Sequence, residues 1–220
     1  MTYTGDVQVG GPADTRDIDG LTVTKIAVGP YDNNAYLLRC TSTGQGLLID
    51  AAAEPERLIE MIGDTPVGVI VTTHRHPDHW QALTELAKHT GAELVAHEAD
   101  ASALPVRVTR LASHGDRVQF GDVSLAVVHL RGHTPGSIAL VYDADGRLDD
   151  SPHLWTGDSL FPGGVGKTTT PETFTSLFND VSERLFGPLP DPAWVYPGHG
   201  KDTTLGVERP HLPEWRERGW

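Results

Sequence analysis

The sequence predicts a single mixed domain of the α+β or α/β class. The chain has 220 residues, a length that suits one domain. Hydrophobic residues make up 38% of it and charged residues 21%, which allows a sizeable core and argues against disorder. Strand-like runs fall into two groups, 21–72 and 93–157, each interleaved with helical segments. Two sheets packed face to face with helices outside satisfy this pattern, and other mixed layouts fit it nearly as well.

The first part of the chain predicts a lead-in followed by strands. Residues 1–20 are rich in Gly, Asp and Thr without an apolar period, so we expect a loose lead-in before a domain at 21–220. Apolar and β-branched runs predict the strands of the first group, at 21–28, 34–40, 46–50 and 67–73. Similar runs predict later strands at 93–97, 118–120, 123–130, 138–142 and 193–196.

Helices are predicted between these strands by their start and stop signals. The segment 54–63 has Pro55 in its first turn, and Gly91 closes a second helix that begins at Leu83. The segment 171–186 combines a Thr-Pro-Glu start with apolar residues at helical spacing. The tail from Leu205 is polar and is expected to be partly helical.

Charge and composition exclude several partners. Thirty acidic residues against seventeen basic ones give a formal charge of −13, which disfavours nucleic acids and anionic membrane surfaces. No apolar run approaches the roughly 20 residues that span a bilayer, and the first twenty residues do not resemble a secretion signal. The single cysteine, Cys40, is compatible with a reducing compartment, so we expect a cytoplasmic protein.

The main functional signal is a histidine cluster that follows a predicted buried strand. His74, His76, Asp78 and His79 place four metal-binding side chains within six residues. Neutral imidazole nitrogens and a carboxylate suit zinc and similar divalent ions. Without an ion, packing three imidazoles and a carboxylate together would be electrostatically costly. The cluster therefore predicts a metal site.

One segment cannot complete two coordination shells, so further ligands are needed. Three candidates occur where strands meet glycine-rich loops: His133, Asp158 and His199. Each follows a glycine, which gives the backbone freedom to present an exposed ligand.

These motifs resemble the metallo-β-lactamase superfamily. H-x-H-x-D-H at 74–79 is followed by G-H-T-P-G at 132–136, T-G-D-S at 156–159 and G-H-G at 198–200, in the family's order. The resemblance implies a four-layer αββα sandwich in one domain, with a dinuclear metal site at one edge. It implies that the first metal is held by His74, His76 and His133. It implies a second metal on Asp78, His79 and His199, and Asp158 as the bridge.

The resemblance also implies the chemistry. Two divalent ions share a hydroxide that acts as the nucleophile, with Asp78 as the catalytic residue that orients it. We expect zinc, with iron or manganese as alternatives.

Within the superfamily the chain is most similar to glyoxalase II-like thioester hydrolases. Gly-Asp-Ser-Leu-Phe at 157–161 and Thr-Thr-Leu-Gly-Val-Glu-Arg at 203–209 resemble that branch. Two departures put the thiol carrier in question. The family's helical C-terminal domain is not expected, because the chain continues only 21 residues beyond His199 (220 − 199). Its usual Gly-Cys-Gly-Arg is here Gly-Val-Gly-Lys at 164–167, which makes Lys167 the candidate substrate-binding residue.

The sequence leaves competing activities open. The first expectation is hydrolysis of a small-molecule thioester of a low-molecular-weight thiol. A persulfide dioxygenase with mononuclear iron and a lactonase are the alternatives. No nucleic acid or membrane partner is expected, and a homodimer is left open.

Overall fold

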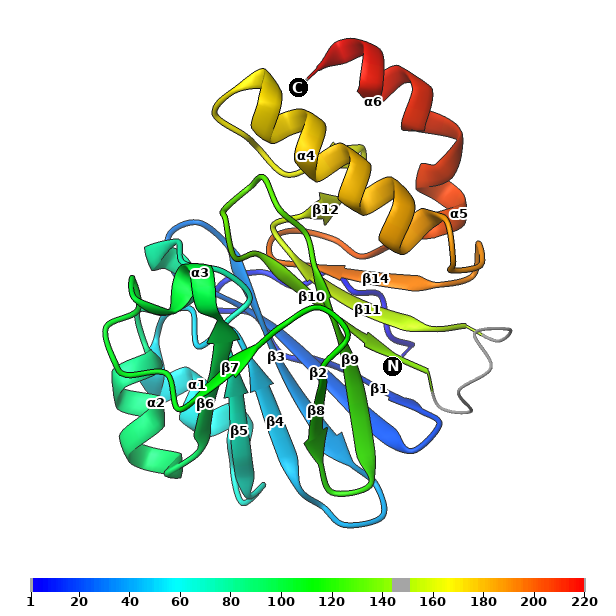
Figure 1. Cartoon of the computed structure of the whole chain (residues 1–220). Helices are drawn as coiled ribbons and strands as arrows, with labels where there is room; N and C mark the ends of the chain where they lie inside the picture. Colours follow the sequence, from blue (N-terminus) through cyan, green and yellow to red (C-terminus); the bar gives the residue numbers. More distant parts are fainter. Residues whose placement is uncertain (1, 144–150, 220) are drawn as a thin grey trace.

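The computed structural model describes residues 2–143 and 151–219. Residues 1 and 220, the outer ends of the two predicted segments, and residues 144–150 lie outside the described part. A seven-stranded sheet packs against a six-stranded sheet, and helices cover both outer faces (Figure 1). The four-layer αββα sandwich in one domain is thereby confirmed. Among the described residues, no helix is long and apolar enough to cross a membrane.

The first sheet is antiparallel in its first half and parallel in its second. Its strands in spatial order are β1 (Asp14–Ile18), β2 (Leu21–Val28), β3 (Asn33–Cys40), β4 (Gly46–Ile49), β5 (Val67–Val71), β6 (Glu93–His97) and β7 (Arg110–Ala112). Strands β4 to β7 run parallel. The connecting helices are α1 (Pro55–Ile62), α2 (Leu83–Thr90) and α3 (Glu98–Ala101), with a 3₁₀ turn at Pro77–His79.

The second sheet has the order β15-β14-β11-β10-β9-β8. Its strands are β8 (Arg117–Phe120), β9 (Val123–His129), β10 (Ile138–Tyr142), β11 (His153–Gly157), β14 (Trp194–Pro197) and β15 (Thr203–Thr204). A small hairpin pairs β12 (Leu160–Phe161) with β13 (Gly164–Val165). The outer helices are α4 (Pro171–Val181), α5 (Leu205–Glu208) and α6 (Leu212–Arg218), with a π-helical turn at Ser182–Phe186 and a 3₁₀ turn at Arg209–His211.

Three hydrophobic clusters hold the four layers together. The central cluster lies between the sheets and contains Leu38 and Trp155, both with no exposed surface. A second cluster packs α1 and α2 on the first sheet and contains Leu86, which has no exposed surface. The third packs α4 and α6 on the second sheet through Phe178 and Trp215. The central strands β4, β10 and β11 are therefore buried along their whole length, as expected for strands covered on both faces.

Two sequence-based expectations about the strands were wrong. Residues 14–18 of the expected loose lead-in form β1, which pairs with β2 along its whole length. Only alternate residues of β1 are partly buried, so this edge strand can be polar and carries no apolar signal. The strand at 93–97 belongs to the first sheet, not the second, because the helical crossovers after β4 and β5 return the chain to the same sheet. The predicted helix at 171–186 changes to a π-helical turn at Ser182.

Leu38→Ala is expected to lower the free energy of unfolding by about 2–5 kcal/mol. The substitution leaves a cavity between two sheets that are held by other side chains and cannot fully close it. The matched control is Leu111→Ala, because Leu111 of β7 is 52% exposed. Urea denaturation measures both variants, and equal losses would contradict the prediction.

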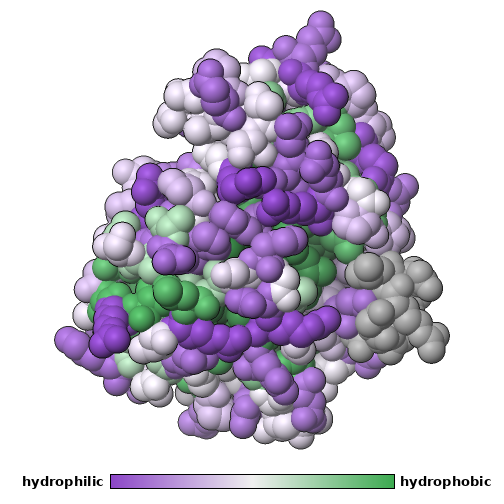
Figure 2. Space-filling model, viewed as in Figure 1, coloured by the Kyte–Doolittle hydropathy of each residue, from purple (hydrophilic) through white to green (hydrophobic). Residues whose placement is uncertain are grey.

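The surface of this face is mixed in character. Figure 2 shows hydrophobic residues gathered over β6 and β7, and a hydrophilic band between the strands and α4.

Candidate metal centre

The predicted ligands meet at the edge where parallel strands end. Strands β4 and β5 are parallel, so Asp50 and the loop that begins at His74 leave the first sheet side by side. Strands β11 and β14 are also parallel, so Asp158 and His199 leave the second sheet at the same edge. His133 reaches this edge from the loop after β9. The site therefore lies across the ends of both sheets (Figure 1).

His74, His76 and His133 form the first cluster. His74 Nε2 lies 3.0 Å from His76 Nδ1 and 3.3 Å from His133 Nε2. A tetrahedral ion with metal–nitrogen distances of about 2.0–2.1 Å spaces its ligand atoms about 3.3–3.4 Å apart. The three nitrogens are therefore placed where one ion could accept all of them.

Asp78, His79 and His199 form the second cluster. His79 Nε2 lies 3.3 Å from His199 Nε2. Asp78 Oδ2 lies 3.6 Å from the first of these nitrogens and 3.4 Å from the second. This spacing also fits the ligand atoms of one ion.

Asp158 lies between the two clusters. Its Oδ2 is 3.6 Å from His133 Nε2 and 3.4 Å from His199 Nε2, and its Oδ1 is 3.3 Å from His79 Nε2. Oδ1 is buried and has no hydrogen-bond donor among the described residues. A buried carboxylate oxygen without a donor is costly unless a cation compensates it. The donor set and this orphaned oxygen fit a pair of divalent ions.

Backbone carbonyls orient two of the histidines. His199 Nδ1 lies 2.8 Å from the carbonyl of Tyr31, and His133 Nδ1 lies 2.7 Å from the carbonyl of Lys167. A carbonyl oxygen only accepts, so each Nδ1 carries a proton, and the neutral form of each ring has its lone pair on Nε2. This is the tautomer that can bind a metal through Nε2.

Asp50 orients the ligands from the first sheet, and sequence analysis missed it. It is buried, accepts from the Thr73 amide and hydroxyl at 2.7 and 2.8 Å, and lies 2.8 Å from His79 Nδ1. The Thr73 hydroxyl in turn lies 3.1 Å from His74 Nδ1. The sequence did contain a signal for Asp50. This aspartate directly follows one predicted strand, the histidine motif directly follows another of the same group, and groups at the ends of such strands can lie close together.

Asp100, also missed, holds the His133 loop against the histidine motif. Its carboxylate accepts from the Arg75 amide at 3.0 Å, from the Gly136 amide at 2.9 Å and from the Thr134 hydroxyl. Asp100 is itself buried and lies in α3, the helix that directly follows β6. One side chain thereby connects the segments that carry His74, His76 and His133.

Two glycines allow the backbone to approach Asp158. A Cβ on Gly198 would lie 2.1 Å from Asp158 Oδ1, and a Cβ on Gly166 would lie 1.7 Å from the Asp158 carbonyl oxygen. Any side chain at either position would displace the carboxylate or its backbone.

The charges of the site compensate one another. Burial alone would lower the pKa of His79, but the carboxylates of Asp158 and Asp50 outweigh it and raise the pKa to about 10. The pKa of His199 is likewise raised to about 9 by Asp158 and Asp78 in spite of burial. A hydrogen bond with His199 holds the pKa of Asp78 well below its usual range. In metal-free protein, protons on His79 and His199 thus occupy the nitrogens that divalent cations would need as ligands.

A cavity of about 430 Å³ opens beside the first cluster and Asp158. His133 and Asp158 form part of its wall, and Phe161 and Val165 add apolar surface. Lys167, the predicted substrate-binding residue, lines it with an exposed side chain. The structure therefore brings all seven predicted metal ligands together and places Lys167 next to them.

Arg218 of α6 lines the same cavity, and sequence analysis did not single it out. Its guanidinium donates to the Gly163 carbonyl at 3.2 Å. No motif marks this arginine, because it reaches the site from a helix at the far end of the chain.

Comparisons with known proteins find relatives of similar length and fold. A hydroxyacylglutathione hydrolase, GloC, from Haemophilus influenzae is 30% identical over 214 residues, which cover 88% of this chain and 97% of that protein. The crystal structure of ETHE1 from Myxococcus xanthus is 28% identical with a TM-score of 0.75, covering 89% of this chain and 84% of the other. The crystal structure of TTHA1623 in a di-iron-bound form is 32% identical with a TM-score of 0.69, covering 84% and 96%.

The sequence pattern of the Metallo-beta-lactamase superfamily matches residues 28–199. This range contains the six side chains of the two clusters, Asp158 between them, and every strand from β3 to β14. The chain belongs to the metallo-β-lactamase superfamily, and its relatives include hydroxyacylglutathione hydrolases.

Proposed function

We propose that this protein is a dinuclear metal-dependent hydrolase that cleaves a thioester of a low-molecular-weight thiol. The observation that carries the proposal is the convergence of two three-residue clusters on the two oxygens of Asp158. The similarity to the hydrolase GloC over nearly the full length of both chains supports the thioester, and the di-iron-bound relative supports the dinuclear centre.

In this proposal most of the site's side chains hold the metal ions, and Asp78 also orients the attacking water. Two divalent ions, zinc by expectation and iron or manganese as alternatives, would supply Lewis-acid activation of a carbonyl and of water. Asp78 is the proposed catalytic residue that orients the attacking water, because its carboxylate is 23% exposed while His79 is fully buried. Asn33 Nδ2 donates to Asp78 Oδ2 at 2.9 Å and fixes that carboxylate.

The cavity supports a small anionic substrate. Its volume of about 430 Å³ lies within the usual range for small-molecule sites. Lys167 and Arg218 offer two cations on a wall that is otherwise largely apolar. These features suit a thiol carrier with a carboxylate and an acyl group that reaches the metal ligands.

An activity panel with metal analysis tests this function. Metal-loaded protein is assayed with an S-lactoylglutathione-type thioester, an acyl-homoserine lactone and a glutathione persulfide. We expect two ions per chain and fastest turnover of the thioester. One iron per chain with sulfite formed from the persulfide would replace the hydrolase with a dioxygenase. Faster turnover of the lactone would replace the thioesterase with a lactonase.

Lys167→Met is expected to raise KM for an anionic thioester about tenfold with little change in kcat. The substitution removes one charge-assisted contact, worth about 1.5 kcal/mol or more. The backbone carbonyl that orients His133 remains, so metal content should not change. Lys88→Met, on an exposed position of α2, is the control. Loss of metal from the Lys167 variant, or an unchanged KM, would contradict the substrate-binding role.

A further inference from the structure

A fully buried lysine lies behind the second cluster. Lys25 of β2 has no exposed surface, which is rare for a lysine. Its ammonium donates to the Gly5 carbonyl at 2.7 Å, the Gly200 carbonyl at 2.8 Å and Asp202 Oδ1 at 2.7 Å. An ammonium has three N–H donors, so all of them are used.

Asp202, the counter-ion, is equally well satisfied. Its side chain is 1% exposed. While Oδ1 accepts from Lys25, Oδ2 accepts from the Tyr3 hydroxyl at 2.7 Å and the Trp194 indole at 2.9 Å. The ion pair is therefore built with a complete set of partners.

Lys25 of this pair forms a hydrogen bond with the segment that carries His199. Gly200 directly follows this histidine, and its carbonyl accepts from Asn34 Nδ2 at 2.9 Å as well as from Lys25. Asn34 Nδ2 also donates to the Pro197 carbonyl at 2.9 Å, and the Asn34 amide donates to the Gly198 carbonyl at 2.8 Å. Side chains and backbone of the first sheet thus hold a ligand-bearing loop of the second.

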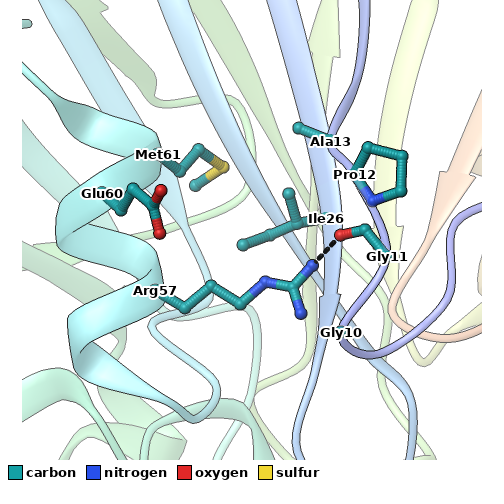
Figure 3. A pocket seen from close by; sticks show the side chains of 8 residues that line it. All are labelled: Gly10, Gly11, Pro12, Ala13, Ile26, Arg57, Glu60 and Met61. Carbon is teal, nitrogen blue, oxygen red and sulfur yellow. Dashed lines mark hydrogen bonds between the residues drawn. The ribbon is translucent and has the colours of Figure 1, made fainter.

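The N-terminal segment that contains Tyr3 and Gly5 covers the ion pair. A Cβ on Gly5 would lie 2.4 Å from Asp202 Oδ2, so the chain passes directly against the carboxylate. Further along, Arg57 of α1 donates to the Gly11 carbonyl beside a cavity of about 540 Å³ (Figure 3). Contacts at Gly5 and Gly11 thus hold this segment in place, and Lys25 beneath it has no exposed surface.

A buried ion pair often contributes little to the free energy of unfolding, so stability alone does not explain this one. Its desolvation penalty often exceeds the attraction between the charges, and apolar side chains of similar volume can replace it without loss. An apolar side chain cannot donate to the Gly200 carbonyl.

We propose that Lys25 and Asp202 are a positioning pair that holds the Gly200 carbonyl, so that His199 keeps the orientation needed for the second metal. This inference rests on the dinuclear centre of the proposed function. It adds that affinity at the Asp78–His79–His199 cluster depends on Lys25, whereas affinity at the His74–His76–His133 cluster does not.

Metal titration of Lys25→Met tests the pair. Metal-free protein is titrated with Co²⁺ and with Zn²⁺ against a competing chelator, which gives two dissociation constants and the absorption spectrum of each cobalt site. We expect the second-site Kd to rise about tenfold and the first-site Kd to stay within about twofold, as for other outer-shell partners of metal ligands. Lys201→Met is the control, because Lys201 is 70% exposed and pairs with Asp6 at the surface.

The double variant Lys25→Met/Asp202→Asn separates positioning from stability. It removes the unpaired buried carboxylate, so we expect it to unfold at a higher temperature than Lys25→Met and still bind the second ion weakly. Recovery of second-site affinity in the double variant, or equal weakening of both sites in Lys25→Met, would overturn the positioning role while leaving the proposed function intact. A wild-type protein that binds only one ion would overturn both.

Discussion

Asp158→Ala is expected to lower kcat/KM for the thioester by about a thousandfold or more and to reduce metal content from two ions to one or none. The carboxylate is the only group placed between both clusters in the described structure, within 3.3–3.6 Å of His79, His133 and His199. Metal-assisted stabilisation is worth several kcal/mol, and each 1.36 kcal/mol changes the rate tenfold. Elemental analysis after dialysis and steady-state kinetics measure the two effects.

The fold should survive this substitution. Alanine removes a buried carboxylate, while Asp50, 2.8 Å from His79 Nδ1, remains as the counter-ion of that histidine. Circular dichroism is therefore expected to match wild type. Asp191→Ala is the control, because Asp191 is 67% exposed and pairs with Arg209 away from the two clusters. A variant at Asp158 that keeps two ions and near-wild-type turnover would refute the bridging role.

Asp50→Asn is expected to weaken metal binding by up to about 100-fold and to lower the free energy of unfolding by on the order of 3 kcal/mol. Asparagine keeps the shape but loses the charge that faces His79 Nδ1 at 2.8 Å. Removal of a carboxylate behind a metal-ligating histidine commonly costs 10–100-fold in affinity, and breaking a buried charged pair costs several kcal/mol. Metal titration and urea denaturation measure these losses.

The effect on stability should depend on pH in metal-free protein. Burial would lower the pKa of His79, but Asp158 and Asp50 raise it from 6.5 to about 10. The stabilisation from this charged histidine is fully present below about pH 6.5 and is lost as the pH rises through 10. The stability difference between wild type and Asp50→Asn should therefore shrink between pH 7 and pH 10. Asp64→Asn, on an exposed position, should show no such change, and a constant difference for Asp50→Asn would exclude the charged pair.

The convergence of the seven candidate metal ligands could be predicted because local sequence marks each of them. Four of the seven lie within six residues, and each of the other three follows a glycine that ends a strand or lies in the loop directly after one. The structure brings all seven to one edge. The spacing of nearby residues and the ends of strands can both be identified in a single sequence.

The groups behind the ligands could not be predicted in the same way, because their partners are distant. Asp50 and His79 are 29 residues apart, Asp100 and Thr134 are 34 apart, and Lys25 and Asp202 are 177 apart. A partial signal did exist for Lys25. Alternation along β2 places it on the same face as Leu21 and Val23, which lie in the central core. An inward-facing lysine in such a strand indicates a buried partner.

The position of the centre across the ends of both sheets has a consequence for folding. The loop after β5 belongs to one sheet, whereas His133, Asp158 and His199 belong to the other, so bound ions would cross-link the two halves of the sandwich. Ions that bind only the assembled centre stabilise the folded state by mass action. The fraction of folded chains would then follow the supply of free metal, and metal starvation would reduce the amount of protein as well as its activity.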